Sequence, residues 1–389
     1  MYVIGNCRLI TQDKIIENGN LFIKDGKIVK IIVGDVEKDY DAGGRYVSAG
    51  FIDIHTHGGY GSDFMDATDE AFDNVLKFHL DNGTTSVVAT SVTASISSTE
   101  RFLNFCREYM QKERKYARVL GAHLEGPYLS VKNKGAQKEE YLLNPEKDGY
   151  EFILRHKDVV KTVTISPELS GAGEMTKTLT ENGITVCGGH DDGIYPNFMP
   201  AVENGLKHLT HIYCAMSELR FVDGKRNVGL REYGLLDDNL TAEMIFDERH
   251  IPTSLALLLL KAKGADKLCV VSDSLRCAGM PVDGKLYKLG TLDDEDAQLF
   301  KVADGVAVLA DGTRYAGSIT PVQKMVKNLL NAGVLVCEAF KVGTSTPAKI
   351  LGRADIGRID KGCVADLCVF ENDFSLKDVF TDGKLYALK

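Results

Sequence analysis

Eight short apolar segments alternate with helix-length segments, and this alternation constrains the fold of the chain more than any other feature. Several of the intervening segments end in a glycine where a helix stop is expected, as at Asn82-Gly83 and Asn182-Gly183. Eight β/α repeats predict a parallel (β/α)8 TIM-like barrel with its active site at the carboxyl ends of the strands. The predicted strands are 51–57, 85–91, 118–125, 161–167, 184–190, 208–213, 241–247 and 267–273.

An open, doubly wound α/β sheet is the rival fold for the same pattern. That fold usually places a glycine-rich phosphate loop directly after its first strand. The chain lacks such a loop, and eight repeats are the number that closes a barrel. We therefore expect the barrel.

Short alternating segments at both ends of the chain predict a second, smaller unit. The N-terminal segments 20–23 and 27–33 are separated by Asp25-Gly26, a strong hairpin signal, and Asp382-Gly383 follows a similar segment near the C-terminus. We expect a small β-sandwich domain built from both termini, residues 1–49 and 351–389, around a barrel of residues 50–350.

Composition narrows the class of protein. The chain is 44% hydrophobic and 26% charged, with a net charge of −9, which argues against a nucleic-acid surface or a polybasic membrane patch. No signal-peptide pattern and no apolar run of membrane-spanning length is evident. Nine cysteines without a CxxC pair indicate reduced core residues, so we expect a cytoplasmic globular protein that acts on a small molecule.

Polar residues at the ends of the predicted strands are the candidate metal-binding and catalytic residues. His55 and His57 alternate on the first strand, so they point to the same side. Each such histidine alone is more typical of a structural hydrogen bond. Six residues of metal-ligand type at one end of one barrel favour a hydrolytic metal centre. They are His55, His57, Glu125, His190, His211 and Asp273.

At these residues the chain resembles the amidohydrolase superfamily and, within it, the N-acetylglucosamine-6-phosphate deacetylase family. The most specific motifs are His-Leu-Glu-Gly-Pro at 123–127 and Thr-His-Ile-Tyr-Cys-Ala-Met at 210–216. Further matching segments are 50–58, 166–168, 189–190 and 271–273, and the likeness extends over nearly the whole chain.

The resemblance implies a role for each site residue. Glu125, His190 and His211 match the invariant metal site, whereas His55 and His57 match a pair that holds a second ion. Asp273 matches the catalytic aspartate. The residues matched to substrate binding are Ala136, Gln137, Cys214, Ala215, His250 and Arg231, the last reaching the phosphate across a homodimer interface.

The implied reaction is removal of the acetyl group from an N-acetylhexosamine 6-phosphate, foremost N-acetylglucosamine 6-phosphate. A divalent metal, zinc or iron foremost and one or two ions per subunit, activates the water that attacks the amide. Asp273 acts as general base toward that water and then as general acid toward the departing amine. The products are acetate and the amino sugar phosphate.

Several alternatives stay open. The galactosamine isomer is a close variant, and other amidohydrolases cleave different N-acyl or cyclic amides. Those enzymes often carry a carboxylated lysine at the end of the fourth strand, where this chain has none. A binding or scaffold protein would not need the base Asp273.

Three departures from the family pattern bear on the substrate. Cys214 replaces a common asparagine, and Gln137 replaces a histidine that helps to polarise the carbonyl, so that more polarisation falls on metal. The basic segment 217–230, with Arg220, Lys225 and Arg226, is either a lid over an anionic substrate or a solvated loop.

Overall fold

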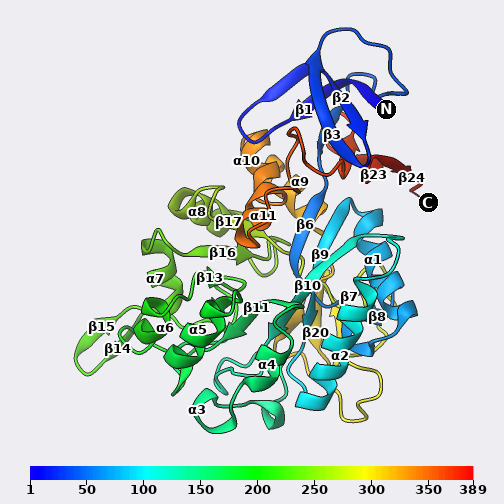
Figure 1. Ribbon diagram of the computed structural model, residues 1–389. Coiled ribbons are helices and arrows are strands. Elements are labelled where there is room, and N and C mark those ends of the chain that lie inside the picture. The colour runs from blue at the N-terminus through cyan, green and yellow to red at the C-terminus, as the bar shows by residue number, and fades with distance from the viewer. Residues whose placement is uncertain (389) are drawn as a thin grey trace.

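The computed structural model describes residues 1–388 and contains the predicted barrel (Figure 1). Its eight parallel strands follow one another round the sheet in chain order. The last strand closes onto the first through the residues beyond it, since Asp273 N–H donates to the His55 carbonyl (2.9 Å) and His57 N–H to that of Ser274 (2.9 Å). The strands are β6 (Phe51–Thr56), β9 (Thr84–Ser91), β10 (Arg118–Glu125), β11 (Val160–Ile165), β12 (Thr185–Gly188), β13 (His208–Leu209), β16 (Thr241–Met244) and β17 (Leu268–Val270).

Helices connect successive barrel strands and lie outside them (Figure 1). The seam between β17 and β6 is covered by α9 (Val322–Asn331), whose buried face includes Val322, Met325 and Val326. The helix between β12 and β13 is only 5 residues long and carries Pro200 in its first turn, a position that tolerates proline. The other outer helices are α1 (Asp69–Asp81), α2 (Ile96–Tyr109), α4 (Glu151–Arg155), α5 (Ala172–Glu181), α6 (Met199–Glu203), α7 (Leu230–Leu236), α8 (Thr253–Lys263), α10 (Val336–Lys341) and α11 (Ser345–Ile350).

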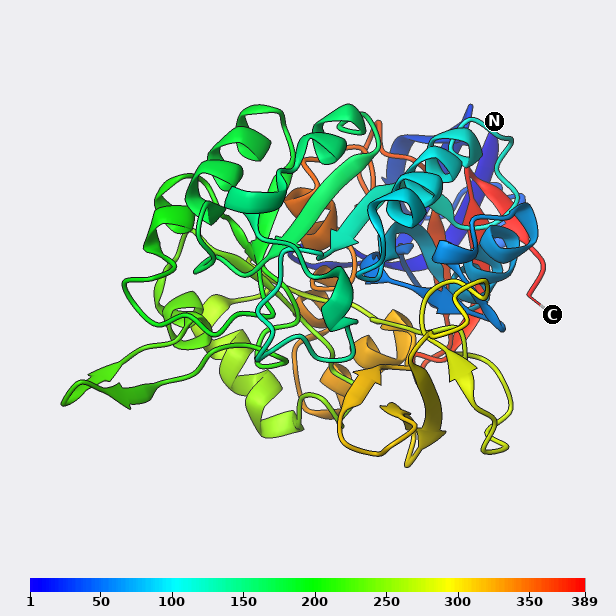
Figure 2. The same cartoon turned by 90° about the horizontal axis from the view of Figure 1, so that it is seen from below.

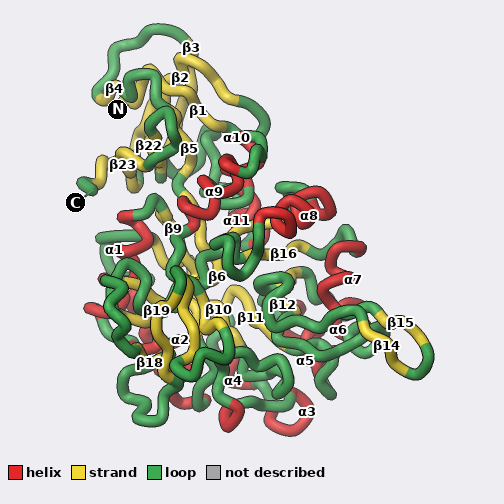
Figure 3. Tube along the Cα trace, turned by 180° about the vertical axis from the view of Figure 1, so that it is seen from behind, coloured by secondary structure: helices red, strands yellow, loops and turns green. Residues whose placement is uncertain are grey.

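Strands from both ends of the chain form one sheet at one end of the molecule (Figure 3). The two ends meet where β5 (Tyr46–Ala49) pairs with β22 (Leu367–Phe370) in antiparallel register. The remaining strands are β1 (Tyr2–Ile10), β2 (Ile15–Lys24), β3 (Lys27–Val33), β4 (Tyr40–Asp41), β23 (Leu376–Thr381) and β24 (Lys384–Tyr386).

This terminal sheet has a hydrophobic cluster of its own, which includes Ile4, Leu21, Leu367 and Phe380. The division of the chain at 49/50 and 350/351 stays a proposal.

Besides the antiparallel pair of β7 (Gly58–Gly59) and β8 (Ser62–Asp63) that follows β6, two smaller β elements interrupt the barrel repeats (Figure 2). The first is a hairpin of β14 (Arg220–Val222) and β15 (Lys225–Asn227), which projects from the barrel wall. The second is a four-stranded antiparallel sheet between β17 and α9, formed by β18 (Tyr287–Lys288), β19 (Leu299–Ala303), β20 (Val306–Leu309) and β21 (Tyr315–Gly317).

No helix among residues 1–388 has both the length and the apolar composition that a membrane crossing requires.

Candidate metal centre and active site

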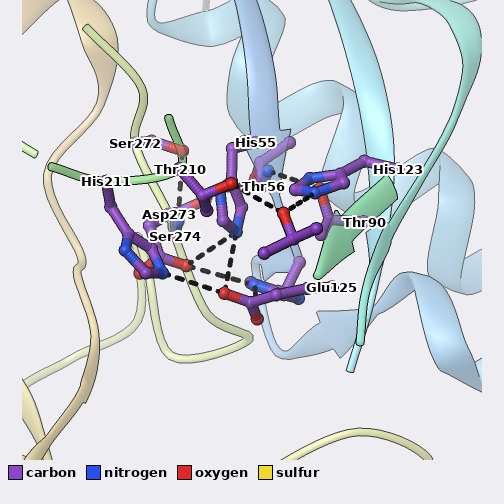
Figure 4. A network of polar contacts seen from close by, with 12 residues as sticks. His55, Thr56, Thr90, His123, Glu125, Thr210, His211, Ser272, Asp273 and Ser274 are labelled. Carbon is purple, nitrogen blue, oxygen red and sulfur yellow. Dashed lines mark hydrogen bonds and ion pairs between the residues drawn. The ribbon is translucent and has the colours of Figure 1, made fainter. Parts of the chain in front are cut away.

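The site lies at the carboxyl ends of the barrel strands, where its side chains converge on Glu125 (Figure 4). Glu125 is the last residue of β10. His190, His211 and Asp273 instead lie two or three residues beyond β12, β13 and β17, which end before the predicted limits. These three residues have positive φ angles of 50°, 26° and 45°. The left-handed backbone turns their side chains out of the ladder and toward the barrel axis.

Two overlapping groups of buried donors share Glu125. In the first, His190 Nε2 and His211 Nε2 lie 3.1 and 3.0 Å from Glu125 Oε1. In the second, His55 Nε2 lies 3.4 Å from Oε1 and His57 Nε2 3.5 Å from Oε2. The alternation predicted for His55 and His57 therefore places both rings on this carboxylate.

Hydrogen bonds from behind orient two of the histidine rings. The carbonyl of Asn133 accepts from His190 Nδ1 (2.9 Å), which leaves Nε2 facing Glu125. The carboxylate of Glu243 accepts from His55 Nδ1 (2.6 Å), so the His55 Nε2 lone pair also faces the centre.

This donor set fits a metal ion. His190 Nε2 and His211 Nε2 approach to 3.1 Å, and His55 Nε2 is buried without a hydrogen-bond partner in residues 1–388. A shared cation is the group that satisfies several converging imidazole lone pairs and a carboxylate at once. The two candidate ligand groups are Glu125, His190 and His211, and His55, His57 and Glu125.

The charges of the cluster support one another. Burial raises the pKa of Glu125, but the surrounding imidazoles of His55, His190 and His211, whose protons a bound cation would replace, bring this pKa well below its usual value. Burial likewise raises the pKa of Glu243, and His55 and His208 reverse that effect. Both carboxylates are therefore ionised and can hold cationic partners.

Asp273 lies beside this cluster. Its Oδ1 is 3.1 Å from His57 Nε2 and 3.7 Å from His55 Nε2. Ser318 N–H donates to the Asp273 carbonyl (2.8 Å), which ties the end of β21 to this residue. A carboxylate held so close to the ligand groups is placed to move protons at the same centre.

A cavity of about 460 Å³ opens above the cluster. That volume suits a small organic molecule. Of the residues predicted from the sequence, those that line it are Glu125, Ala136, Gln137, His190, His211, Cys214, Ala215, His250 and Asp273. His55 and His57 lie beneath Glu125 instead.

The predicted substrate-binding residues differ in their surroundings. Gln137 donates from Nε2 to Glu125 Oε2 (2.6 Å), so part of its amide is already engaged. His250 bonds through Nδ1 to Asp247 (2.8 Å). Burial raises the pKa of the Cys214 thiol, which keeps it neutral and unreactive.

Arg231 does not reach the cavity. It pairs with Glu218 and Glu232, and its guanidinium lies 4.9 Å from the centre of the Tyr213 ring. The basic segment 217–230 is also absent from the cavity lining, since its hairpin points away from the barrel (Figure 2). The segment does not line the cavity of its own chain, and its role as a lid stays a prediction.

Sequence reasoning missed two parts of the site. Glu243 is a buried carboxylate inside the seventh strand, where its acidic side chain among apolar neighbours was the available signal. Lys132, Arg314 and Tyr315 are further parts of the cavity wall that were not predicted, whereas the next residues, Ala316 and Gly317, belong to a segment that shares the family resemblance.

The model of the amidohydrolase family matches residues 46–386. The N-acetylglucosamine-6-phosphate deacetylase of Bacillus subtilis is 30% identical, with 95% of this chain and 93% of that protein covered. An N-acetylgalactosamine-6-phosphate deacetylase of Escherichia coli O157:H7 is 29% identical over 99% of both chains.

A solved structure of high similarity is a mutant of the N-acetyl-D-glucosamine-6-phosphate deacetylase of Mycobacterium smegmatis, in complex with N-acetyl-D-glucosamine-6-phosphate. Its TM-score is 0.89 at 25% identity, and the alignment covers 99% of this chain and 98% of that one.

Proposed function

The chain belongs to the amidohydrolase family and, within it, to the N-acetylglucosamine-6-phosphate deacetylases, and we propose that it removes the acetyl group from an N-acetylhexosamine 6-phosphate. The products are acetate and the amino sugar phosphate. The observation that carries the proposal is the position of Asp273 beside the converged donors around Glu125, on the floor of a cavity of substrate size.

Two ligand groups are available for the metal. Glu125, His190 and His211 would hold one ion, and His55 and His57 would hold a second beside Glu125. When bound, a divalent cation supplies a Lewis acid that acidifies water and polarises a carbonyl oxygen. Zinc or iron suits a set of imidazole and carboxylate donors.

Asp273 moves the proton in the reaction. Its carboxylate takes a proton from the attacking water as the water oxygen bonds to the amide carbon. The C–N bond then breaks, and Asp273 returns the proton to the departing nitrogen, which leaves as the neutral amine. The second proton of the water stays on the acid product, so amide and water give amine and acetic acid, which ionises to acetate when its proton passes to solvent.

The neighbouring residues position the substrate. Gln137 keeps one N–H free of Glu125 and can donate it to the acetyl oxygen. Ala136, Cys214, Ala215 and His250 line the wall where the sugar and its phosphate bind. Because Gln137 carries no charge, the cation bears most of the carbonyl polarisation.

Further attributes belong to the same proposal. A cytoplasmic location accords with the nine cysteines, all of which are free, and a homodimer is part of the same proposal. The galactosamine isomer is a second candidate substrate, because the E. coli O157:H7 relative that carries that name is about as similar to this chain as the Bacillus subtilis one.

Acetate release from a panel of acetylated sugars tests the function. We expect the highest kcat/KM with N-acetylglucosamine 6-phosphate, a lower value with the galactosamine isomer and a much lower one without the phosphate. Metal content is measured on the same preparation by atomic emission.

Other results of the panel lead to other conclusions. A preference for the galactosamine isomer reassigns the sugar. Hydrolysis of a cyclic amide such as dihydroorotate, without acetate release, overturns the deacetylase assignment. A metal-loaded protein that hydrolyses nothing in the panel is a binding protein.

A further inference from the structure

A second cavity, of about 320 Å³, lies at the opposite end of the barrel from the cluster around Glu125. Asp266, which lines this cavity, precedes β17. Ser345, also in the lining, closely follows Gly343, whose carbonyl accepts from Ile52 N–H at the start of β6 (2.9 Å). The cavity therefore lies at the amino ends of these strands. Barrel enzymes carry out their reactions at the carboxyl ends, so a group bound here lies outside the reaction.

The walls of this cavity come from both parts of the chain. The barrel side contributes α11 and the segment 352–358, and Gln12 contributes from the turn between β1 and β2 of the terminal sheet. Helix α11 lies between the terminal sheet and the barrel strands (Figures 1 and 3). A Cβ at Gly357 would lie 2.6 Å from the Thr344 carbonyl oxygen, so the backbone beside Arg358 is packed directly against the start of α11.

Two of the four charged side chains in the lining are compensated by neighbours. Arg353 donates to the two carboxylate oxygens of Asp355 (2.7 and 2.8 Å). Asp266 Oδ1 lies 3.2 Å from Lys341 Nζ. These two side chains therefore add little net charge to the cavity.

The other two charged side chains, Lys349 and Arg358, carry positive charge without a counterion. No carboxylate of residues 1–388 lies within ion-pair distance of either side chain, and the Arg358 guanidinium donates to the Ala354 carbonyl. The whole chain has a net charge of −9. Two free cations in one cavity are therefore a local excess of positive charge that favours an anion.

We propose that this cavity binds a phosphate group, either free phosphate or the phosphate of a small metabolite. A phosphate monoester carries about −1.5 to −2 charges at neutral pH, which matches the two positive charges of Lys349 and Arg358. The arginine can donate two parallel hydrogen bonds to phosphate oxygens, and the lysine adds a point charge. The Ser345 hydroxyl, in the same lining, is a further donor.

The reactivity of Lys349 measures occupancy of this site directly, because a bound anion shields the amine from an acetylating reagent. Acetylation rates of individual lysines in the full-length protein are measured by mass spectrometry, in inorganic phosphate and in sodium chloride of equal ionic strength. Two charge-assisted contacts should give a Kd of about 1 mM. Phosphate at about 10 mM should then slow acetylation of Lys349 about tenfold.

Controls separate a site from general screening by salt. Lys361 is also exposed but lies outside the lining, so its acetylation rate should be the same in both salts. Arg358→Ala should remove most of the protection of Lys349, and Arg358→Lys should keep part of it. The matched control is Arg226→Ala, which removes an exposed arginine from the β14–β15 hairpin and should keep the full protection.

Glucose 6-phosphate in place of inorganic phosphate distinguishes the two sources of the ligand. Stronger protection by the sugar phosphate supports a site for a phosphorylated metabolite, and equal or weaker protection supports a site for free phosphate. Equal slowing at Lys349 and Lys361 overturns the inference, as does full protection in Arg358→Ala.

Acetate release separates this site from the proposed function. Arg358→Ala should release acetate at the wild-type rate, because the cavity is at the far end of the barrel from the cluster around Glu125. A wild-type protein that releases no acetate contradicts the proposed deacetylation, whereas the protection of Lys349 is measured without any turnover.

Discussion

Three residues of the site share a backbone device. His190, His211 and Asp273 each follow a barrel strand and each have a positive φ, a conformation that costs a non-glycine residue about 1–3 kcal/mol. The surrounding hydrogen bonds hold them there, such as that from Ser318 N–H to the Asp273 carbonyl. In a regular strand, successive side chains alternate between the two faces of the sheet. The positive φ angles instead direct the side chains of all three residues toward one point.

Asp273→Asn tests the proton-transfer role. The amide has the same shape but cannot accept a proton, so kcat should fall about 10²–10⁴-fold. Metal content should stay at the wild-type value, because Asp273 belongs to neither ligand group. Steady-state acetate release and atomic emission measure the two quantities. Turnover close to wild type would remove Asp273 from the mechanism.

Glu243→Gln tests whether Glu243 holds His55 in place and thereby supports metal binding by His55 and His57. Glu243 accepts from His55 Nδ1 (2.6 Å), His208 Nε2 (3.1 Å) and the His211 N–H (3.1 Å), and an amide has one acceptor oxygen where the carboxylate has two. We expect metal affinity to fall about tenfold to a hundredfold, first at His55 and His57.

The readout is the number of ions per chain after dialysis against increasing chelator. The reference is a double replacement of His55 and His57 by alanine, which should lose the second ion and keep the first. Glu371→Gln is the control, since this carboxylate pairs with Arg45 on the terminal sheet. An unaltered chelator profile in Glu243→Gln would show that the support is dispensable.

The sequence alone indicates which residues can serve as metal ligands, but not which side chains contact those ligands in the fold. The alternation of His55 and His57, and the polar residues after apolar runs, are local signals that any strand carries. Glu243 is visible in the sequence as an acidic residue among apolar neighbours, but its partner His55 lies 188 positions away, so no window of sequence contains their contact.

At the scale of elements, four Asp-Gly turns make the small β structures. Asp25-Gly26, Asp223-Gly224, Asp304-Gly305 and Asp382-Gly383 all have two positive φ angles, as the tight turn of a two-residue hairpin requires. The first and last were used to predict the terminal unit. The turns Asp223-Gly224 and Asp304-Gly305 carry the same signal. They lie inside connections between barrel strands, where the β/α pattern predicts helices and loops.

Gly317→Ala tests how β21 supports Asp273. A Cβ at this glycine would lie 2.9 Å from the Asp273 carbonyl oxygen and 3.0 Å from Leu275 Cγ, so strand or aspartate must shift. A displacement of about 1 Å at a reacting group can cost about a hundredfold in rate. We therefore expect kcat to fall at least tenfold.

The control for this substitution is Gly305→Ala in the β19–β20 turn, which has a φ of +79° and nothing within 4 Å of the added atom. Both variants place an alanine at a positive φ, but only Gly317→Ala adds a steric clash, so thermal unfolding should show the larger loss of stability for Gly317→Ala. Equal kcat in the two variants would contradict the idea that β21 positions Asp273.

At the scale of the whole molecule, the barrel and the terminal sheet were predictable and their junction was not. The spacing of hydrophobic residues predicts each strand or helix locally. Eight β/α repeats then leave few topologies in which the sheet can close. The contact of Arg114 with Asp366 joins the barrel to the terminal sheet across 252 positions of the chain, which a period of two or 3.6 residues cannot reveal.

Arg114 connects the barrel to the terminal sheet. Its guanidinium donates to Asp366 (2.9 and 3.0 Å) and Asp382 (3.0 Å) in the C-terminal part, and to the Thr85 carbonyl (2.9 Å) in the barrel. The Arg114 side chain is only 14% exposed and that of Asp366 only 6%. Removing one partner of such a buried set leaves the carboxylates uncompensated.

Arg114→Ala should therefore lower the free energy of unfolding by about 3 kcal/mol, measured by urea denaturation. Arg118→Ala is the matched control, because Arg118 makes a single ion pair to the same Asp382 and is 33% exposed. Its loss should cost at most about 1 kcal/mol. If the two losses are equal, the buried network adds nothing beyond a surface ion pair. The terminal sheet is then held to the barrel by apolar packing and strand pairing alone.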